Sequence, residues 1–176
     1  MAKIFLNYGH GGQDCGAVGF SGINFERDIN KKIGKKIAWR LRAAGHSVKT
    51  FQQKNSFKEV AEKANAGQYD LIVSIHCNAA GDTRANGTET LYFPTSHKGI
   101  KAASIIQKAL VAGVGLRDRG IKPRGDLHVL RHTKAPAVLV ELAFISNSDE
   151  EKLLTGKPGA FSKAVAAGIN EYIKGV

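Results

Sequence analysis

LIVSIHCN at residues 71–78 decides the fold, because a short apolar run leads directly into an imidazole. A run of this length, bounded by a polar residue on its amino side, is typical of a strand buried on both faces of a parallel sheet. Such a strand rarely has a structural reason to end in His76. We therefore expect this histidine to lie at the carboxyl end of a central strand.

Similar runs recur along the chain and are separated by segments of helical length. Strands are expected at residues 3–8, 47–51, 71–76, 88–93 and 137–141, with a further short strand near 127–130. Helices are expected over about residues 24–44, 57–66, 98–112 and 160–173. This alternation predicts an α/β fold in one domain, residues 1–176, with a twisted, mostly parallel but mixed sheet of about six strands and helices on both faces.

The charge of the chain favours polyanionic partners. There are 26 Lys and Arg against 15 Asp and Glu, a net charge of +11. Such a surface favours encounter with nucleic acid, anionic lipid or the teichoic acids of a cell wall. The chain has no paired aromatic stacking motif that would read bases, so we expect no nucleic-acid partner.

Membrane insertion is not expected, because no stretch approaches the about 20 apolar residues that a spanning helix needs. Met1–Ile4 runs directly into the first strand with no signal-peptide core, which predicts synthesis in the cytoplasm without a signal peptide. Cys15 and Cys77 are too few for a disulfide scaffold. Three interpretations of these two cysteines stay open: buried packing residues, a redox-sensitive pair or metal ligands.

Glu26 lies on the apolar stripe of the helix expected over residues 24–44. At 100° per residue it falls about 20° from Ile33, in line with the other aliphatic residues of that face. A lone buried carboxylate is costly, so it must be neutralised, hydrogen-bonded or bound to a cation. The alternative is a carboxylate satisfied by the free amides and the dipole at the helix start.

Two histidines complete a possible metal site with Glu26. His10 follows Gly9 and precedes Gly11 and Gly12, which let the backbone bend and free the imidazole. Polar residues at the carboxyl ends of strands in an open α/β sheet converge although they lie far apart in sequence. His10, Glu26 and His76 supply two nitrogens and a carboxylate, the ligand set of catalytic zinc with one open position.

Glu141 follows four apolar residues, and desolvation there raises the pKa of a carboxylate toward the range of a general base. The alternatives are a carboxylate that supports the metal ligands or a strand-end ion pair with arginine. His128 and His132 flank a Gly- and Arg-rich segment, residues 113–131, that could form a rim or lid. We expect them, with Asn78, to contact substrate, although Asn in a loop is most often a turn former.

Four motifs in this order resemble a known family. They are GHGGQDCGA at residues 9–17, Glu26, SIHCNA at residues 74–79, and PAVLVE at residues 136–141 followed by FISN at 144–147. The chain resembles the zinc-dependent N-acetylmuramoyl-L-alanine amidases of the amidase type 3 family, which occur in phage endolysins and bacterial autolysins. The resemblance extends from Lys3 to about Tyr172, although Asn7-Tyr8 replaces the Asp-Pro usual in the family.

The resemblance implies one zinc ion held by His10, Glu26 and His76, with Glu141 as the catalytic glutamate. The implied reaction is hydrolysis of the amide between N-acetylmuramic acid and the L-alanine of the stem peptide. The expected partners are peptidoglycan and anionic wall polymers, met after release from the cell or as the catalytic part of a longer secreted protein. A zinc carboxypeptidase or deacetylase acting on the wall, or a non-catalytic wall-binding module, is the alternative.

Overall fold

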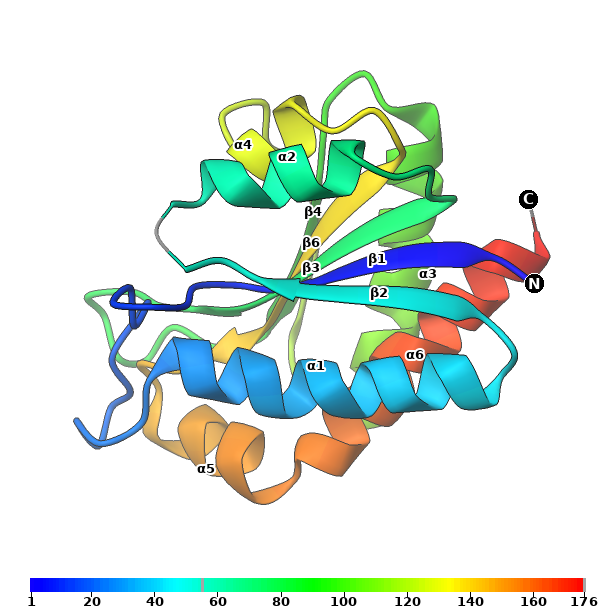
Figure 1. Ribbon diagram of the computed structural model, residues 1–176. Helices are drawn as coiled ribbons and strands as arrows, with labels where there is room; N and C mark the ends of the chain where they lie inside the picture. The colour runs from blue at the N-terminus through cyan, green and yellow to red at the C-terminus, as the bar shows by residue number, and fades with distance from the viewer. Residues whose placement is uncertain (55, 176) are drawn as a thin grey trace.

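One mixed sheet organises the residues that this computed structural model describes, 1–54 and 56–175 (Figure 1). Its strands are β1 (Lys3–Tyr8), β2 (Ser47–Gln52), β3 (Leu71–Asn78), β4 (Thr88–Tyr92), β5 (Asp118–Pro123) and β6 (Ala137–Phe144). They lie in the order β2-β1-β3-β6-β4-β5. β2, β1, β3 and β6 are parallel, whereas β4 runs antiparallel to β6 and parallel to β5. The predicted mixed, mostly parallel sheet is confirmed.

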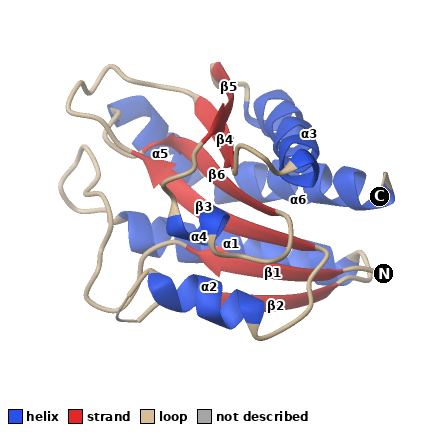
Figure 2. Cartoon of the chain, turned by 90° about the horizontal axis from the view of Figure 1, so that it is seen from above, coloured by secondary structure: helices blue, strands red, loops and turns tan. Residues whose placement is uncertain are grey.

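Helices cover both faces of the sheet, as expected (Figure 2). The larger layer holds α1 (Glu26–Ala43), α3 (His97–Val114), α6 (Pro158–Lys174) and, beside the end of β6, α5 (Ser148–Gly156). The opposite face carries α2 (Lys58–Asn65) and the short α4 (His128–Arg131). Among the described helices, none combines the length and apolar character needed to cross a membrane.

Side-chain alternation along β3 separates two kinds of environment. Val73, Ile75 and Cys77 belong to the large core under α1, α3 and α6. Ile72 belongs to the smaller core under α2 and α4, and by the period of two in a strand His76 points to that same face. Near the carboxyl ends of the strands, this second face therefore carries polar residues.

The predicted strand near residues 127–130 is wrong, because His128–Arg131 forms the helix α4. Val129 and Leu130 are both buried in the core under α2 and α4. Adjacent residues of a strand would point to opposite faces, whereas one helical turn can direct both into the same core. Sequence alternation alone could not reveal this.

Several elements differ in extent from the prediction. β5 is an edge strand inside the Gly- and Arg-rich segment, and its register with β4 shifts between Thr88 and Thr90. The helix α5 was not expected; it begins after Asn147, whose side chain accepts hydrogen bonds from two backbone amides of its first turn. β3 and β6 continue to Asn78 and Phe144, so His76 and Glu141 lie within the last residues of their strands.

Glu150 fastens the end of β6 to the loop before β4. Its carboxylate is 3% exposed and accepts hydrogen bonds from the backbone amides of Gly87 and Phe144, each at 2.6 Å. Burial raises the pKa of this carboxyl, although the two amide donors act in the opposite direction. The loop at Gly87 and the end of β6 are therefore held together by one side chain.

Replacing Glu150 with alanine leaves two buried amides without an acceptor. We expect Glu150→Ala to lower the free energy of unfolding by roughly 2–4 kcal/mol, since an unsatisfied buried polar group costs about 1–3 kcal/mol. Urea denaturation followed by circular dichroism measures the change. The matched control is Asp149→Ala, whose side chain is 89% exposed and which should cost under about 1 kcal/mol. Equal effects of the two substitutions would contradict this role.

Candidate metal centre

His10 leaves the end of β1 in an unusual backbone conformation. The amide of Gly9 still donates to Ile75 of β3, at 2.9 Å, but His10 itself has a φ of 62°. A non-glycine residue in the left-handed region is uncommon, and strained residues of this kind cluster at functional sites. Its Nδ1 lies 2.9 Å from Asp14 Oδ2, which also accepts a hydrogen bond from Gln53 Nε2 at 3.1 Å. These contacts orient the ring so that Nε2 faces Glu26.

Glu26 is the first residue of α1 and is 4% exposed. Its Oε2 accepts the backbone amide of Ala17 at 3.0 Å, and its Oε1 accepts the backbone amide of Cys77 at 3.1 Å. Asn30, one turn later on the same helix face, donates to Oε1 at 3.2 Å. The carboxylate is thus held from three segments of the chain.

Glu26 lies between the two histidines. Its Oε2 is 3.1 Å from His10 Nε2, and its Oε1 is 3.0 Å from His76 Nδ1. The ladder between β3 and β6 shifts register between His76 and Asn78, and such bulges redirect side chains near active sites. One ligand atom from each of the three residues lies within 4.8 Å of the others. The structure thus brings together the three residues that the sequence singled out.

The electrostatics of the cluster favour a cation. Burial would raise the pKa of Glu26, but hydrogen bonds and charge interactions with His10 and His76 outweigh it and hold the pKa well below its usual range. Burial would lower the pKa of His10, but Glu26 and then Asp14 outweigh it and raise the pKa to about 9. The site therefore places a permanent negative charge beside two basic nitrogens.

The donor set and its surroundings fit a zinc ion. Zinc takes imidazole nitrogen and carboxylate oxygen at about 2.0–2.2 Å in tetrahedral geometry, which places ligand atoms about 3.3 Å apart. Gly9 and Gly16 have no side chain, and this leaves room for the side chains of the candidate ligands. A Cβ at Gly9 would collide with the ring of His76, and one at Gly16 would lie 2.6 Å from His10 Cδ2 and 2.7 Å from Glu26 Oε2.

Glu141 lies beside this cluster on the neighbouring strand, paired in register with His76. Its Oε2 is buried and has no hydrogen-bond partner. Burial raises the pKa of Glu141 to about 7; the charge of His76 opposes the increase and that of Glu26 adds to it. A carboxylate with this pKa can accept and return a proton near neutral pH.

A second carboxylate faces Glu141 from β4. Glu89 is paired in register with Glu141 but is neutralised by Arg119 at 2.7 Å and Lys122 at 2.6 Å, both from β5. Asn78 Nδ2 donates to the other oxygen of Glu89 at 3.1 Å. Asn78 therefore helps to position Glu89, the carboxylate next to Glu141.

A cavity of about 350 Å³ extends from His10 and His76 toward α2 and α4, and we call it the Asn7 pocket. Its lining also includes Asn7, Asp14, Gln53, Phe57, Val60, Ser74, Asp126, Leu127, His128, Val129 and Leu139. His128 thus reaches the same cavity as the two candidate ligands. His132 and Asn78 are not among its lining residues; His132 is exposed and stacks on His128 with ring centres 4.2 Å apart.

Several residues of this site were missed from the sequence. Asp14 contacts His10 from four residues further along, and Asn30 lies four residues after Glu26 on the same helix face. A polar residue one turn from Glu26, on its side of the helix, was a signal that could have identified Asn30. Glu89 gave no such signal, because its proximity to Glu141 depends on the pairing of β4 with β6.

The cysteines do not join the cluster. Cys77 is buried in the large core and donates to Asn30 Oδ1 at 3.4 Å, and burial raises the pKa of its thiol. Cys15 is partly buried, and both thiols are free. In the described residues the candidate metal group contains no cysteine, which favours the packing role for Cys77.

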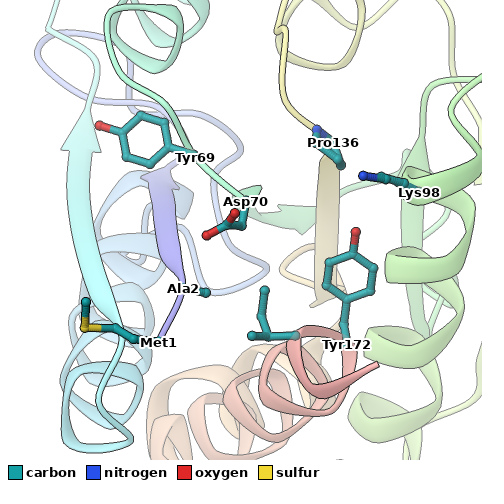
Figure 3. Close-up of a pocket in the computed structure, with 8 residues that line it drawn as sticks. Met1, Ala2, Tyr69, Asp70, Lys98, Pro136 and Tyr172 are labelled. Atoms are coloured by element: carbon teal, nitrogen blue, oxygen red, sulfur yellow. The ribbon is translucent and has the colours of Figure 1, made fainter. Parts of the chain in front are cut away.

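A larger hollow lies at the amino ends of the strands, away from this centre. It has a volume of about 480 Å³, and Figure 3 shows Tyr69, Asp70, Lys98 and Tyr172 around it. The three buried polar side-chain atoms without partners in the described residues, on Asn7, His128 and Glu141, all lie outside its lining. The unpaired polar atoms and the candidate metal ligands therefore lie together at the opposite end of the sheet.

Comparison with known proteins identifies relatives along nearly the whole chain. Residues 4–171 match the family model described as N-acetylmuramoyl-L-alanine amidase. The chain is 40% identical to the endolysin of Bacillus phage SPP1 over 98% of its length. It is 39% identical to the N-acetylmuramoyl-L-alanine amidase LytC of Bacillus subtilis over 85% of its length. These matches span 65% of the endolysin and 31% of LytC.

A solved structure supports the same relationship. The catalytic domain of CwlV, an N-acetylmuramoyl-L-alanine amidase from Bacillus (Paenibacillus) polymyxa, superposes with a TM-score of 0.89 at 33% identity. The match covers 99% of each chain. The fold described above is therefore also the fold of the catalytic domain of this relative.

Asp14 provides a test of the centre. Partners of metal-bound histidines typically contribute 10–100-fold to metal affinity, so Asp14→Asn should weaken zinc binding by about that factor. Titration against a competing chelator measures it. The control is Asp82→Asn, an exposed carboxylate paired with Arg84, which should leave zinc affinity unchanged. Zinc affinity in Asp14→Asn equal to that of the wild type would remove Asp14 from the site.

Proposed function

The chain belongs to the N-acetylmuramoyl-L-alanine amidase family, and from this we propose that it hydrolyses the amide between N-acetylmuramic acid and the L-alanine of the stem peptide. We take residues 1–176 as one catalytic domain. His10, Glu26 and His76 would hold one zinc ion, and Glu141 would move the proton. The substrate is peptidoglycan.

One observation carries this proposal: Glu141 keeps an unpaired, buried carboxylate oxygen one strand away from the His10, Glu26 and His76 cluster. An unpaired carboxylate oxygen is expensive inside a protein, and function is a common reason for retaining one. Its pKa near 7 suits a group that must alternately accept and donate a proton. A non-catalytic wall-binding module would have no use for such a group.

A zinc ion held by these three residues would polarise the scissile carbonyl and lower the pKa of the water that attacks it. Glu141 accepts the proton of the attacking water at its carboxylate. It then delivers this proton to the leaving nitrogen, which departs as the amino terminus of the stem peptide. Arg119 and Lys122 pair with Glu89 and reduce the negative charge that it presents to Glu141, although the charge of Glu89 still contributes to the raised pKa of Glu141.

A digest of purified cell walls tests the reaction. We expect new alanine amino termini and no new reducing sugars, which distinguishes an amidase from a carboxypeptidase, a deacetylase or a glycosidase. A chelator should abolish the release. Glu141→Ala should lower the rate by at least about 10²–10⁴-fold, the usual contribution of general acid–base catalysis, while the protein still binds zinc.

The control for this digest is Glu171→Gln, at an exposed position of α6, which should cleave at the wild-type rate. Near-normal cleavage by Glu141→Ala would exclude Glu141 as the base. Release of terminal alanine or of acetate in place of stem peptides would overturn the assigned reaction.

The place of action follows from the substrate, and we propose that the domain works at the cell wall, as a phage lysin or as the catalytic part of an autolysin. Anionic wall polymers are a further proposed partner. The net charge is +11, and Lys31, Lys32, Lys35 and Lys36 are exposed together on α1. Such a surface raises the local concentration of the enzyme on a polyanion.

Salt separates this surface effect from the chemistry. Exposed charges are screened over about 8 Å at 0.15 M ionic strength and over about 3 Å at 1 M, so lysis of intact walls should fall as sodium chloride rises. Cleavage of a soluble, uncharged muropeptide should change little. Walls stripped of phosphate polymers should lose the salt dependence. Lysis that does not respond to salt would contradict the electrostatic contribution.

A further inference from the structure

Basic side chains gather around a second cavity, at the end of the sheet away from the metal centre. This cavity has a volume of about 620 Å³, and we call it the α3–α4 cavity. Its lining includes His97 and Lys98 from the start of α3, Arg131 from α4 and Lys134 from the segment before β6. None of the described residues that line it is an aspartate or a glutamate. Three permanent cations and an imidazole therefore surround one concave space.

Strand pairing brings these basic residues together from two distant parts of the chain. β4 runs antiparallel to β6, and Tyr92 near the end of β4 pairs with Val138 near the start of β6. The residues that follow β4 therefore lie beside those that precede β6. This places the first turn of α3 next to the segment between α4 and β6, although neither stretch is strongly basic by itself.

The four basic side chains have no counter-ion within residues 1–54 and 56–175. None of them forms an ion pair or a side-chain hydrogen bond. By contrast, two cations of β5 share the carboxylate of Glu89. Asp70 lines the neighbouring hollow, which meets this cavity at Lys98 and Pro136 (Figure 3), but its Oδ2 already accepts the backbone amide of Lys3 at 2.7 Å. A concave surface lined by one sign of charge concentrates ions of the opposite sign.

The chemistry of the lining favours phosphate on a slender chain. Arginine and lysine bind phosphate oxygens through charge-assisted hydrogen bonds. Most of the other lining residues are apolar, and the two hydroxyls are engaged: Ser96 Oγ accepts the amide of Gly99, and Thr133 Oγ1 donates to the carbonyl of Val129. The lining offers no amide or carboxylate side chain to read the edges of bases, as sequence-specific binding of nucleic acid requires.

Resting on the proposed action at the cell wall, we propose that the α3–α4 cavity binds a teichoic acid, a wall polymer of polyol units joined by phosphodiesters. The basic side chains hold its phosphates, and the apolar lining contacts the carbon chain between them. The lysines of α1 attract such a polymer from a distance, whereas this cavity binds individual repeats.

The bound polymer stays clear of the reaction centre. Ala137 lines the cavity, and Glu141 lies four residues further along β6, about 13 Å away at about 3.3 Å per residue. The metal centre therefore remains open to peptidoglycan while the cavity is occupied. This arrangement keeps the domain on the wall between cleavage events.

Binding of purified poly(glycerol phosphate) to the full chain tests the proposal. The polymer is titrated into the protein by calorimetry at 0.15 M sodium chloride. Because contacts from single exposed cations are weak, three are changed together, in a variant that carries Lys98→Gln, Arg131→Gln and Lys134→Gln. We expect this variant to bind the polymer about tenfold more weakly, a change of 1.4 kcal/mol.

The matched control carries Lys49→Gln, Lys108→Gln and Lys163→Gln, at exposed positions on β2, α3 and α6. It lowers the net charge by the same three units but leaves the cavity intact. Its Kd for the polymer should stay within about threefold of the wild type. Equal losses in the two variants would mean that only the overall charge matters, and would overturn the proposal. Thermal unfolding verifies that both variants are folded.

A measurement on the wild type removes the dependence on folding of the variants. In NMR spectra, the backbone amide signals of residues 97–99 and 131–135 should shift with poly(glycerol phosphate), and those of residues 9–11 and 75–77 should not. No shift, or shifts only elsewhere, would overturn the proposal. A single-stranded DNA oligonucleotide with the same number of phosphates should bind at least about tenfold more weakly. Equal or tighter binding of this DNA would overturn the wall polymer as the occupant.

The outcome for the cavity is separate from the outcome for the reaction. Wild-type protein that cleaves walls but fails to bind poly(glycerol phosphate) overturns this site and leaves the amidase function standing. Wild-type protein that cleaves neither complete walls nor walls stripped of phosphate polymers removes the proposed function itself.

Discussion

The structure depends on one buried carboxylate held between two imidazoles. Glu26 carries a charge in a 4% exposed position, and such a charge is tolerated only with close compensation. Its partners come from the turn after β1, from the loop before α1 and from the end of β3. Satisfying Glu26 therefore brings these segments together, and the same contacts that compensate its charge arrange nitrogen and oxygen atoms around a space suited to a cation.

The two faces of the sheet divide stability from chemistry. The face under α1, α3 and α6 is a continuous apolar core, whereas the face under α2 and α4 is apolar only toward the amino ends of the strands. Between that short cover and the carboxyl ends of the strands, Asn7, Ser74 and His76 line a cavity, with Glu141 on the strand beside them. Because α2 and α4 are short, polar side chains on this face can meet a substrate without disturbing the main core.

Much of this arrangement could be predicted from local patterns. The apolar runs that become β1, β3 and β6 indicated a buried parallel sheet, and the position of Glu26 on the α1 stripe indicated its burial. His10, Glu26 and His76 were expected to converge, and the structure places them together, although their role as ligands stays a prediction. The helix α4 and the edge strand β5 could not be predicted, because their short segments are shaped by what they pack against.

The sequence by itself determined the strand pattern, the burial of Glu26 and the family, because these rest on residue order and periodicity. Only the tertiary structure decided the pairing of Glu89 with Glu141, the contact of Asp14 with His10, and the unpaired oxygen of Asn7. These depend on strand order, on a left-handed turn at His10 and on which donors lie within about 3 Å in the folded chain. Distances of that kind are properties of packing, and residue order does not encode them locally.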